Sequence, residues 1–182
     1  MPALVSSMQA YQVILLIVAC VVFCYLAVLF YVTSKALDFR RSLSRKREML
    51  SLIQLEMAST LLSIDSIFKS ASVTYSKQEA DSVDALRQVS SDKRAVGLIK
   101  FNASLIVRAK SSLSYLALSN KWATKSDEFR YCQNAFSDLE RFFRTTVALY
   151  NADIAAYDYY RRATGFKLLM YFFGFKAAEP IG

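Results

Sequence analysis

VILLIVACVVFCYLAVLFY, from Val13 to Tyr31, is the stretch that decides how this chain is organised. It is almost wholly apolar, and no residue before Lys35 carries a charged side chain. About 20 apolar residues in a helix, each rising ~1.5 Å, cross the ~30 Å hydrocarbon core of a bilayer. The sequence therefore predicts one N-terminal transmembrane anchor, over residues 1–34.

The same stretch can be compared with a cleaved signal peptide, which has a basic start, an apolar core of about 7–15 residues and a small-residue cleavage site. This chain has no basic start, and its apolar core is longer. Cleavage before Cys20, as in a lipoprotein, would leave the second apolar run from Val21 to Val32 on the mature protein. We therefore expect an anchor that is not removed.

A basic segment follows the anchor. The run FRRSLSRKR, from Phe39 to Arg47, contains the membrane-proximal basic cluster Arg40, Arg41, Arg45, Lys46 and Arg47, whereas no Lys or Arg precedes the apolar run. The positive-inside rule places such a cluster in the cytoplasm, where it also attracts anionic lipid headgroups. We expect a single-pass protein with its N-terminus outside and residues 35–182 in the cytoplasm.

The rest of the chain lacks residues that interrupt helices. Pro occurs only at positions 2 and 180, and Gly only at positions 97, 165, 174 and 182. There is no Asn-Gly, Asp-Gly or Gly-Gly hairpin signal and no sustained alternation of apolar and polar residues. This composition predicts an all-α fold with long helices.

Apolar stripes at helical spacing mark three long helices. The stripe of the first comprises Leu50, Ile53, Met57, Leu61, Ile64, Phe68 and Ala71. A polar patch, Ser70 to Ser82, predicts a kink or a turn. The stripe of the second comprises Leu98, Phe101, Leu105, Ser112 and Leu116, flanked by Ile99, Ile106 and Leu113. The third is expected to begin at Ser126 and end near Gly165, with its seam at Phe129, Cys132, Phe136, Leu139, Phe143, Thr146, Tyr150 and Tyr157.

These helices predict an elongated antiparallel bundle of three long helices plus a short C-terminal helix. If the first helix leaves the membrane, the second returns and the third leaves again, the apolar segment Phe166 to Phe175 lies at the distal tip. This segment is expected to be a short helix that caps the bundle core. Contacts of Phe172, Phe173 and Phe175 with neighbouring subunits or with a membrane are the alternatives.

The side chains for catalysis or metal binding are largely missing. The chain has no His, and its three Cys show neither zinc-binding spacing nor an acid or His partner. It has no Gly-rich phosphate loop and no nucleophile motif. Half of the net charge of +8 lies next to the anchor, and the aromatic residues follow the core stripe. We expect no enzyme activity, cofactor, metal, small-molecule substrate or nucleic acid.

The third helix resembles the C-terminal signature of the LemA family. Tyr150 to Asp158, YNADIAAYD, resembles the pattern Y-N-x-x-V-x-x-Y-N, and Gly174-Phe175 stands at the spacing of the family's G-F. Upstream, Cys132-Gln133, Phe136 and Glu140 keep the register, and Ser126 to Phe129 resembles N-E-N-F. The family's R-R-H-D-L-I-P segment is reduced to Met57 to Ser63, so the chain looks like a divergent member. The resemblance implies a bacterial membrane-anchored helical bundle with no established catalytic activity.

The signature residues also have a physical interpretation. Tyr150, Ile154 and Tyr157 share a helix face, and Asn151 and Asp158 lie on the adjoining edge beside the small Ala155. Polar groups at such an edge fix register or oligomeric state in bundles. The edge is expected to lock the bundle within one chain, and packing between subunits is the alternative.

Together these patterns favour a structural role in the bacterial inner membrane. We expect a homo-oligomeric scaffold in the lipid bilayer that organises or shapes that membrane. The alternative is an adaptor that presents its distal tip to a membrane protease or another membrane-protein partner.

Overall fold

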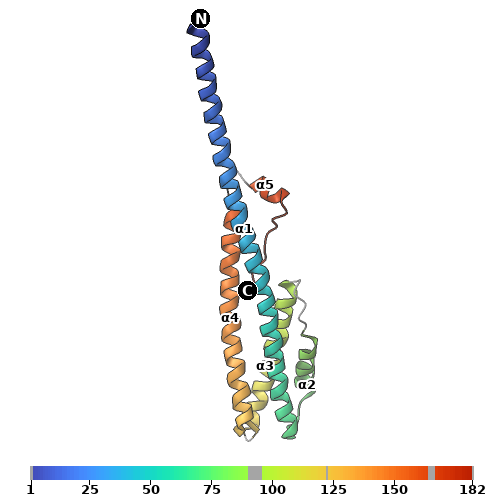
Figure 1. Cartoon of the computed structure of the whole chain (residues 1–182). Helices are drawn as coiled ribbons and strands as arrows, with labels where there is room; N and C mark the ends of the chain where they lie inside the picture. The colour runs from blue at the N-terminus through green and yellow to red at the C-terminus, as the bar shows by residue number, and fades with distance from the viewer. Residues whose placement is uncertain (1, 90–95, 122, 164–166, 182) are drawn as a thin grey trace. The chain divides into compact units, whose positions relative to one another are not determined.

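A computed structural model gives the fold and describes residues 2–89, 96–121, 123–163 and 167–181 (Figure 1). Every regular element within those ranges is a helix, as the sequence predicts. The elements are α1 (Pro2–Ser70), α2 (Lys77–Asp84), the 3-10 helix η1 (Ala85–Gln88), α3 (Val96–Ser119), the 3-10 helix η2 (Ala123–Lys125), α4 (Asp127–Arg161) and α5 (Lys167–Phe172). Gly165, the expected end of the third helix, lies outside the described residues.

The chain divides into two compact units. Residues 1–41 and 155–178 form one, hereafter the anchor unit, and residues 42–154 and 179–182 form the other, hereafter the core unit. The divisions fall inside α1 and inside α4. The helix α1 is uninterrupted because Pro2 stands in its first turn, where Pro is tolerated, and no other Pro or Gly occurs before Gly97.

The first helix ends at Ser70 in a Schellman turn. Ser72 takes the left-handed conformation, with φ of 56°, and its N–H donates to the carbonyl of Lys69 at 3.0 Å. The N–H of Val73 donates to the carbonyl of Phe68, also at 3.0 Å. This pair of bonds satisfies the last carbonyls of the helix, and it turns Val73 into the core beside Phe68.

The predicted turn within the polar patch Ser70 to Ser82 is confirmed, and α2 begins inside that patch. Ser76 and Glu79 form a capping box: the Glu79 N–H donates to Ser76 Oγ at 3.3 Å, and the Ser76 N–H donates to Glu79 Oε2 at 2.7 Å. This reciprocal pair satisfies backbone donors at the helix start. The short α2 then packs against α3.

One hydrophobic core holds the core unit together. Its buried members include Ile53, Met57, Leu61, Ile64 and Phe68 of α1, Val83 of α2, Leu86 of η1, Ile106, Ala109, Leu113 and Leu116 of α3, and Phe129 and Phe136 of α4. The stripes predicted for the first and third helices are therefore buried, except for partly buried residues that pack against this core, namely Ala71, Cys132, Leu139 and Phe143. In α3 the flanking residues Ile99, Ile106 and Leu113 are buried, whereas Phe101 is exposed. The expected centre of that stripe was wrong because α3 also packs against α2.

The expected alternation of helix directions is also wrong. Gln54 Nε2 donates to the carbonyl of Ile99 at 2.8 Å, so the early core part of α1 meets the start of α3. Further along, Leu61 of α1 and Leu113 of α3 line one groove, so these two helices run parallel. The helix α4 runs antiparallel to α1, since its first turn brings Phe129 to 5.6 Å from Phe68 between ring centroids.

The physical reason lies in the connection between α1 and α3. Residues 71–95 form a 25-residue connection in the sequence, and the described part, Ala71 to Val89, contains only α2 and η1 as regular elements. Extended residues advance ~3.3 Å each, against ~1.5 Å in a helix, so such a connection can return along the whole core. Hence α3 need not be the returning helix.

This reversal relocates the C-terminal segment. Within the anchor unit, Tyr160 of α4 stacks on Phe39 of α1 with ring centroids 5.8 Å apart. The segment that contains α5 belongs to this same unit. The expectation that the apolar segment Phe166 to Phe175 lies at a distal tip is therefore wrong, because α4 brings it back to the part of α1 that follows the apolar run.

Candidate functional site

The C-terminal segment turns sharply after α5, and its Gly is required for that turn. Gly174 has φ of 73°, and its N–H donates to the carbonyl of Tyr171 at 3.0 Å. The Phe175 N–H donates to the carbonyl of Met170 at 3.1 Å. This second Schellman turn buries Met170 and Phe175 together. The Gly-Phe pair of the sequence signature thus has a local structural reason.

In the anchor unit, Tyr157 receives the segment that leaves this turn. Its ring lies 6.5 Å from that of Phe175, and its hydroxyl donates to the carbonyl of Lys176 at 2.9 Å. Burial raises the pKa of the Tyr157 hydroxyl, against the opposing charges of Arg40 and Arg161. The hydroxyl therefore stays protonated and keeps its role as a donor.

In the core unit, Tyr150 and Asn151 hold the last residues of the chain. Asn151 Nδ2 donates to the carbonyl of Ile181 at 2.7 Å, and the Ile181 N–H donates back to Asn151 Oδ1 at 3.1 Å. The Tyr150 hydroxyl donates to the carbonyl of Glu179 at 3.3 Å and accepts from Arg47 Nε at 2.9 Å. Tyr150 is completely buried. Both residues thus bind the chain's own backbone.

The remaining signature residues are also paired within the chain. Ile154 is buried, and Asp158 forms ion pairs with Arg161 at 3.0 Å and Arg162 at 3.1 Å. The sequence shows that this edge of α4 combines polar residues with the small Ala155. It does not show that an extended C-terminal segment packs against the edge. A helix-period pattern identifies a buried face without identifying what covers it.

A third polar contact, missed in the sequence, lies one turn from Tyr150. Asp153 Oδ2 accepts from Ser42 Oγ at 2.6 Å and from Lys46 Nζ at 2.8 Å. Both side chains of the ion pair are largely buried. Of the basic cluster, Lys46 and Arg47 therefore pair with α4, whereas Arg40, Arg41 and Arg45 are exposed.

The aromatic residues of the C-terminal segment separate into two kinds. Phe175 is only 4% exposed, whereas Phe172 is 75% exposed and Phe173 is 58% exposed. Burial of Phe175 against Tyr157 and outward display of Phe172 and Phe173 thus occur within four residues.

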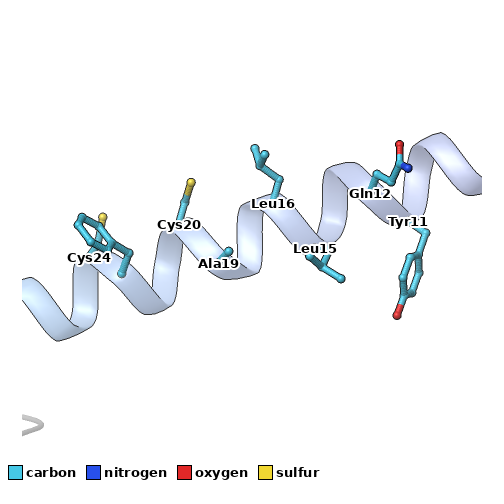
Figure 2. Close-up of a pocket in the computed structure, with 8 residues that line it drawn as sticks. Tyr11, Gln12, Leu15, Leu16, Ala19, Cys20 and Cys24 are labelled. Atoms are coloured by element: carbon cyan, nitrogen blue, oxygen red, sulfur yellow. The ribbon is translucent and has the colours of Figure 1, made fainter.

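The apolar run of α1 presents its side chains outward all round. Within the described part of the chain, one helix, α1, is long and apolar enough to cross a membrane, and its residues from Tyr11 to Val28 are all exposed. Figure 2 shows Leu15, Leu16 and Ala19 along this stretch, with Cys20 and Cys24 on the same helix. The hollow that these side chains border is open helix surface of the kind that lipid tails or another helix fill. Its lining is mainly apolar, with the Tyr11 hydroxyl and the Gln12 amide at one end.

An apolar face runs along the core unit between α1 and α4. Met49, Leu52, Phe142 and Leu149, hereafter the α1–α4 face, are between 43% and 53% exposed. The contact of Lys46 Nζ with the Leu149 carbonyl at 3.2 Å sets the two helices in register there. A shallow groove continues this face toward Cys132.

Among the described residues, no group of three or more His, Cys, Asp and Glu side chains is placed to hold a metal ion. The three cysteines are free thiols, and Cys132 is half-buried. Comparison of the chain with protein-family models, with curated proteins and with solved structures finds no match.

Proposed function

We propose that this protein is a membrane-anchored, non-enzymatic scaffold that self-assembles laterally and organises or shapes a bacterial inner membrane. The observation that carries the proposal is the exposed α1–α4 face in a chain whose N-terminal helix can span a bilayer. In this proposal, residues 1–34 cross the membrane with the N-terminus outside, and residues 35–182 form a divergent LemA-like cytoplasmic bundle. The signature residues from Tyr150 to Asp158, which align with the family pattern, support that relationship.

The occupant we assign to the α1–α4 face is a second copy of this chain. Copies of the chain in one bilayer meet through this face, and a two-fold axis then brings Leu149 near Leu149 of its neighbour. Apolar side chains then meet apolar side chains and leave water. Confinement to the membrane raises the effective concentration of such neighbours.

The test is the mass of the full-length protein in mild detergent, measured by light scattering with the detergent contribution subtracted. We expect a discrete particle of at least twice the mass of the 20.6 kDa chain. Leu149→Arg should reduce it to a single chain, because a charge replaces apolar contact. The matched control is Val107→Arg, at an exposed apolar position of α3 outside the face, which should leave the mass unchanged. A wild-type monomer would contradict the scaffold proposal.

The alternative is an adaptor for a membrane-protein partner, and a groove between α3 and α4 favours it. The groove has a volume of about 570 Å³, an apolar floor that includes Leu113 and Phe129, and a rim with Lys121 and Arg130. These features suit an amphipathic acidic segment of another protein. Such a partner should lose binding to Leu118→Asp, in the same groove, whereas Leu149→Arg should retain binding.

A further inference from the structure

The short helix α5 has one buried side and one exposed side. Met170 is completely buried, whereas Leu168 and Tyr171 are 72% and 80% exposed. Leu168, Tyr171 and Phe172 are spaced three and four residues apart and share a helix face, and Phe173 follows them. Leu168, Tyr171, Phe172 and Phe173 are hereafter the aromatic foot. Met170 and Phe175 thus fix the segment so that the foot points outward.

The aromatic foot belongs to the same unit as the anchor (Figure 1). Within this unit, α1 becomes buried where its apolar run ends, at Val32 and Ala36. Ala36, which is completely buried, lies five residues beyond Tyr31, or about 7.5 Å along a helix. The headgroup layer on each side of a bilayer is roughly 5–8 Å thick. The buried packing of the unit that contains α5 therefore begins at the depth of the headgroups.

The anchor unit is also strongly basic. It contains seven Lys and Arg residues against two Asp residues, which gives it a charge of +5 out of +8 for the whole chain. Arg40, Arg41, Arg162, Lys167 and Lys176 are exposed. Tyr and Phe beside Lys and Arg make up the side-chain set that lies at membrane interfaces, where rings enter the boundary and cationic groups meet phosphates.

We infer that the aromatic foot inserts into the cytoplasmic-side headgroup and acyl boundary of the bilayer that α1 spans, which gives the protein a second membrane contact. This inference rests on the anchoring of α1 in the proposed function. Anionic phospholipid is the occupant that the charge favours. A second copy docked foot to foot would bring two units of charge +5 together, which is repulsive.

The test uses the full-length protein in vesicles of phosphatidylcholine and phosphatidylglycerol, with Cys20, Cys24 and Cys132 replaced by Ala. An environment-sensitive fluorophore is placed singly at Phe172→Cys, at Phe23→Cys in the anchor, or at Tyr115→Cys, an exposed aromatic position of α3. Quenching is measured with lipids that bear a nitroxide near the headgroup, with lipids that bear it on the acyl chain, which reaches the depth of Phe23, and separately with aqueous iodide. We expect the Phe172 label to be quenched by lipid and shielded from iodide, and the Tyr115 label to show the reverse.

The outcomes separate the two proposals. If the Phe23 label is quenched by lipid but the Phe172 label behaves like the Tyr115 label, insertion of the aromatic foot is contradicted, whereas the membrane-spanning role of α1 is supported. If the Phe23 label also behaves like the Tyr115 label, both the membrane-spanning role of α1 and the insertion of the aromatic foot are contradicted. Shielding of the Phe172 label from iodide without quenching by lipid would assign the site to another protein surface and overturn the inference. Vesicles of phosphatidylcholine alone should weaken lipid quenching at Phe172 and leave Phe23 unchanged.

Discussion

Asn151 is the residue on which the C-terminal end of the core unit depends most directly, since its amide both donates to and accepts from Ile181. Asn151→Ala removes both bonds, each worth about 1 kcal/mol net. We expect the free energy of unfolding to fall by about 1–2 kcal/mol, and the Ile181 amide to lose protection from hydrogen exchange. Asn134→Ala, at an exposed position of the same helix, is the matched control and should change neither quantity. Retained protection in Asn151→Ala would contradict the assigned contact.

Glu140 links stability to pH. The pKa of this carboxyl is lowered from its ordinary value, first by the hydrogen bond from Lys110 Nζ at 2.7 Å and then by that from Arg144. A lowered folded-state pKa gives stability that is present above the unfolded-state pKa and is lost as the pH falls through the folded-state value. Wild type should therefore lose more stability than Glu140→Gln on acidification below about pH 4.5, by roughly 0.5–1 kcal/mol for a partly exposed pair.

The measurement for Glu140 is chemical unfolding of both proteins at several pH values from neutral to acid. Asp138→Asn is the control, because Asp138 is an exposed carboxyl nearby on α4. It should follow the wild-type profile. Parallel profiles for wild type and Glu140→Gln would show that the Lys110 contact contributes nothing measurable.

At the scale of elements, the end of α1 carries conformational strain. Ser72 occupies the left-handed region, which costs a non-Gly residue roughly 1–2 kcal/mol. Ser72→Gly should raise the free energy of unfolding by about 0.5–1 kcal/mol, since part of the relief is offset by the greater freedom of Gly in the unfolded chain. Ser70→Gly, inside the last helical turn, should lower it instead. Unfolding in urea would check both signs, and a destabilised Ser72→Gly would contradict the turn geometry.

Periodicity predicts which residues form helices better than it predicts which helices pack against one another. The stripe from Leu50 to Phe68 is buried as expected because only a helix of that period aligns these side chains. The sequence Ser76-Lys77-Gln78-Glu79 carries the capping-box signal for α2, which the interpretation of that patch as a simple turn overlooked. Phe101 is expected in the core but is exposed. The apolar stripe on a helix that packs against several neighbours has no unique centre, so periodicity alone misplaces it.

At the scale of the whole molecule, assembly through the α1–α4 face should resist salt, because its contacts are apolar. Charge pairs are screened as the Debye length falls from about 30 Å at 0.01 M salt to about 3 Å at 1 M. The mass of the detergent-extracted particle should therefore be the same at both salt concentrations. A particle that dissociates at high salt would indicate that exposed charges such as Arg45, rather than Leu149, hold the copies together.

The sequence by itself determined the all-helical composition, the apolar run able to span a bilayer, the helix start near Ser126 and the buried stripes of α1 and α4. These follow from local rules, namely the absence of Pro and Gly, capping and period. Only the tertiary structure decided that α3 runs parallel to α1, and hence that the C-terminal segment returns to the anchor unit. It also decided that Tyr150, Asn151 and Tyr157 bind backbone carbonyls of that segment. The physical reason is that a helix pattern specifies how strongly a face avoids water, whereas the partner of that face depends on how a long connection crosses the core.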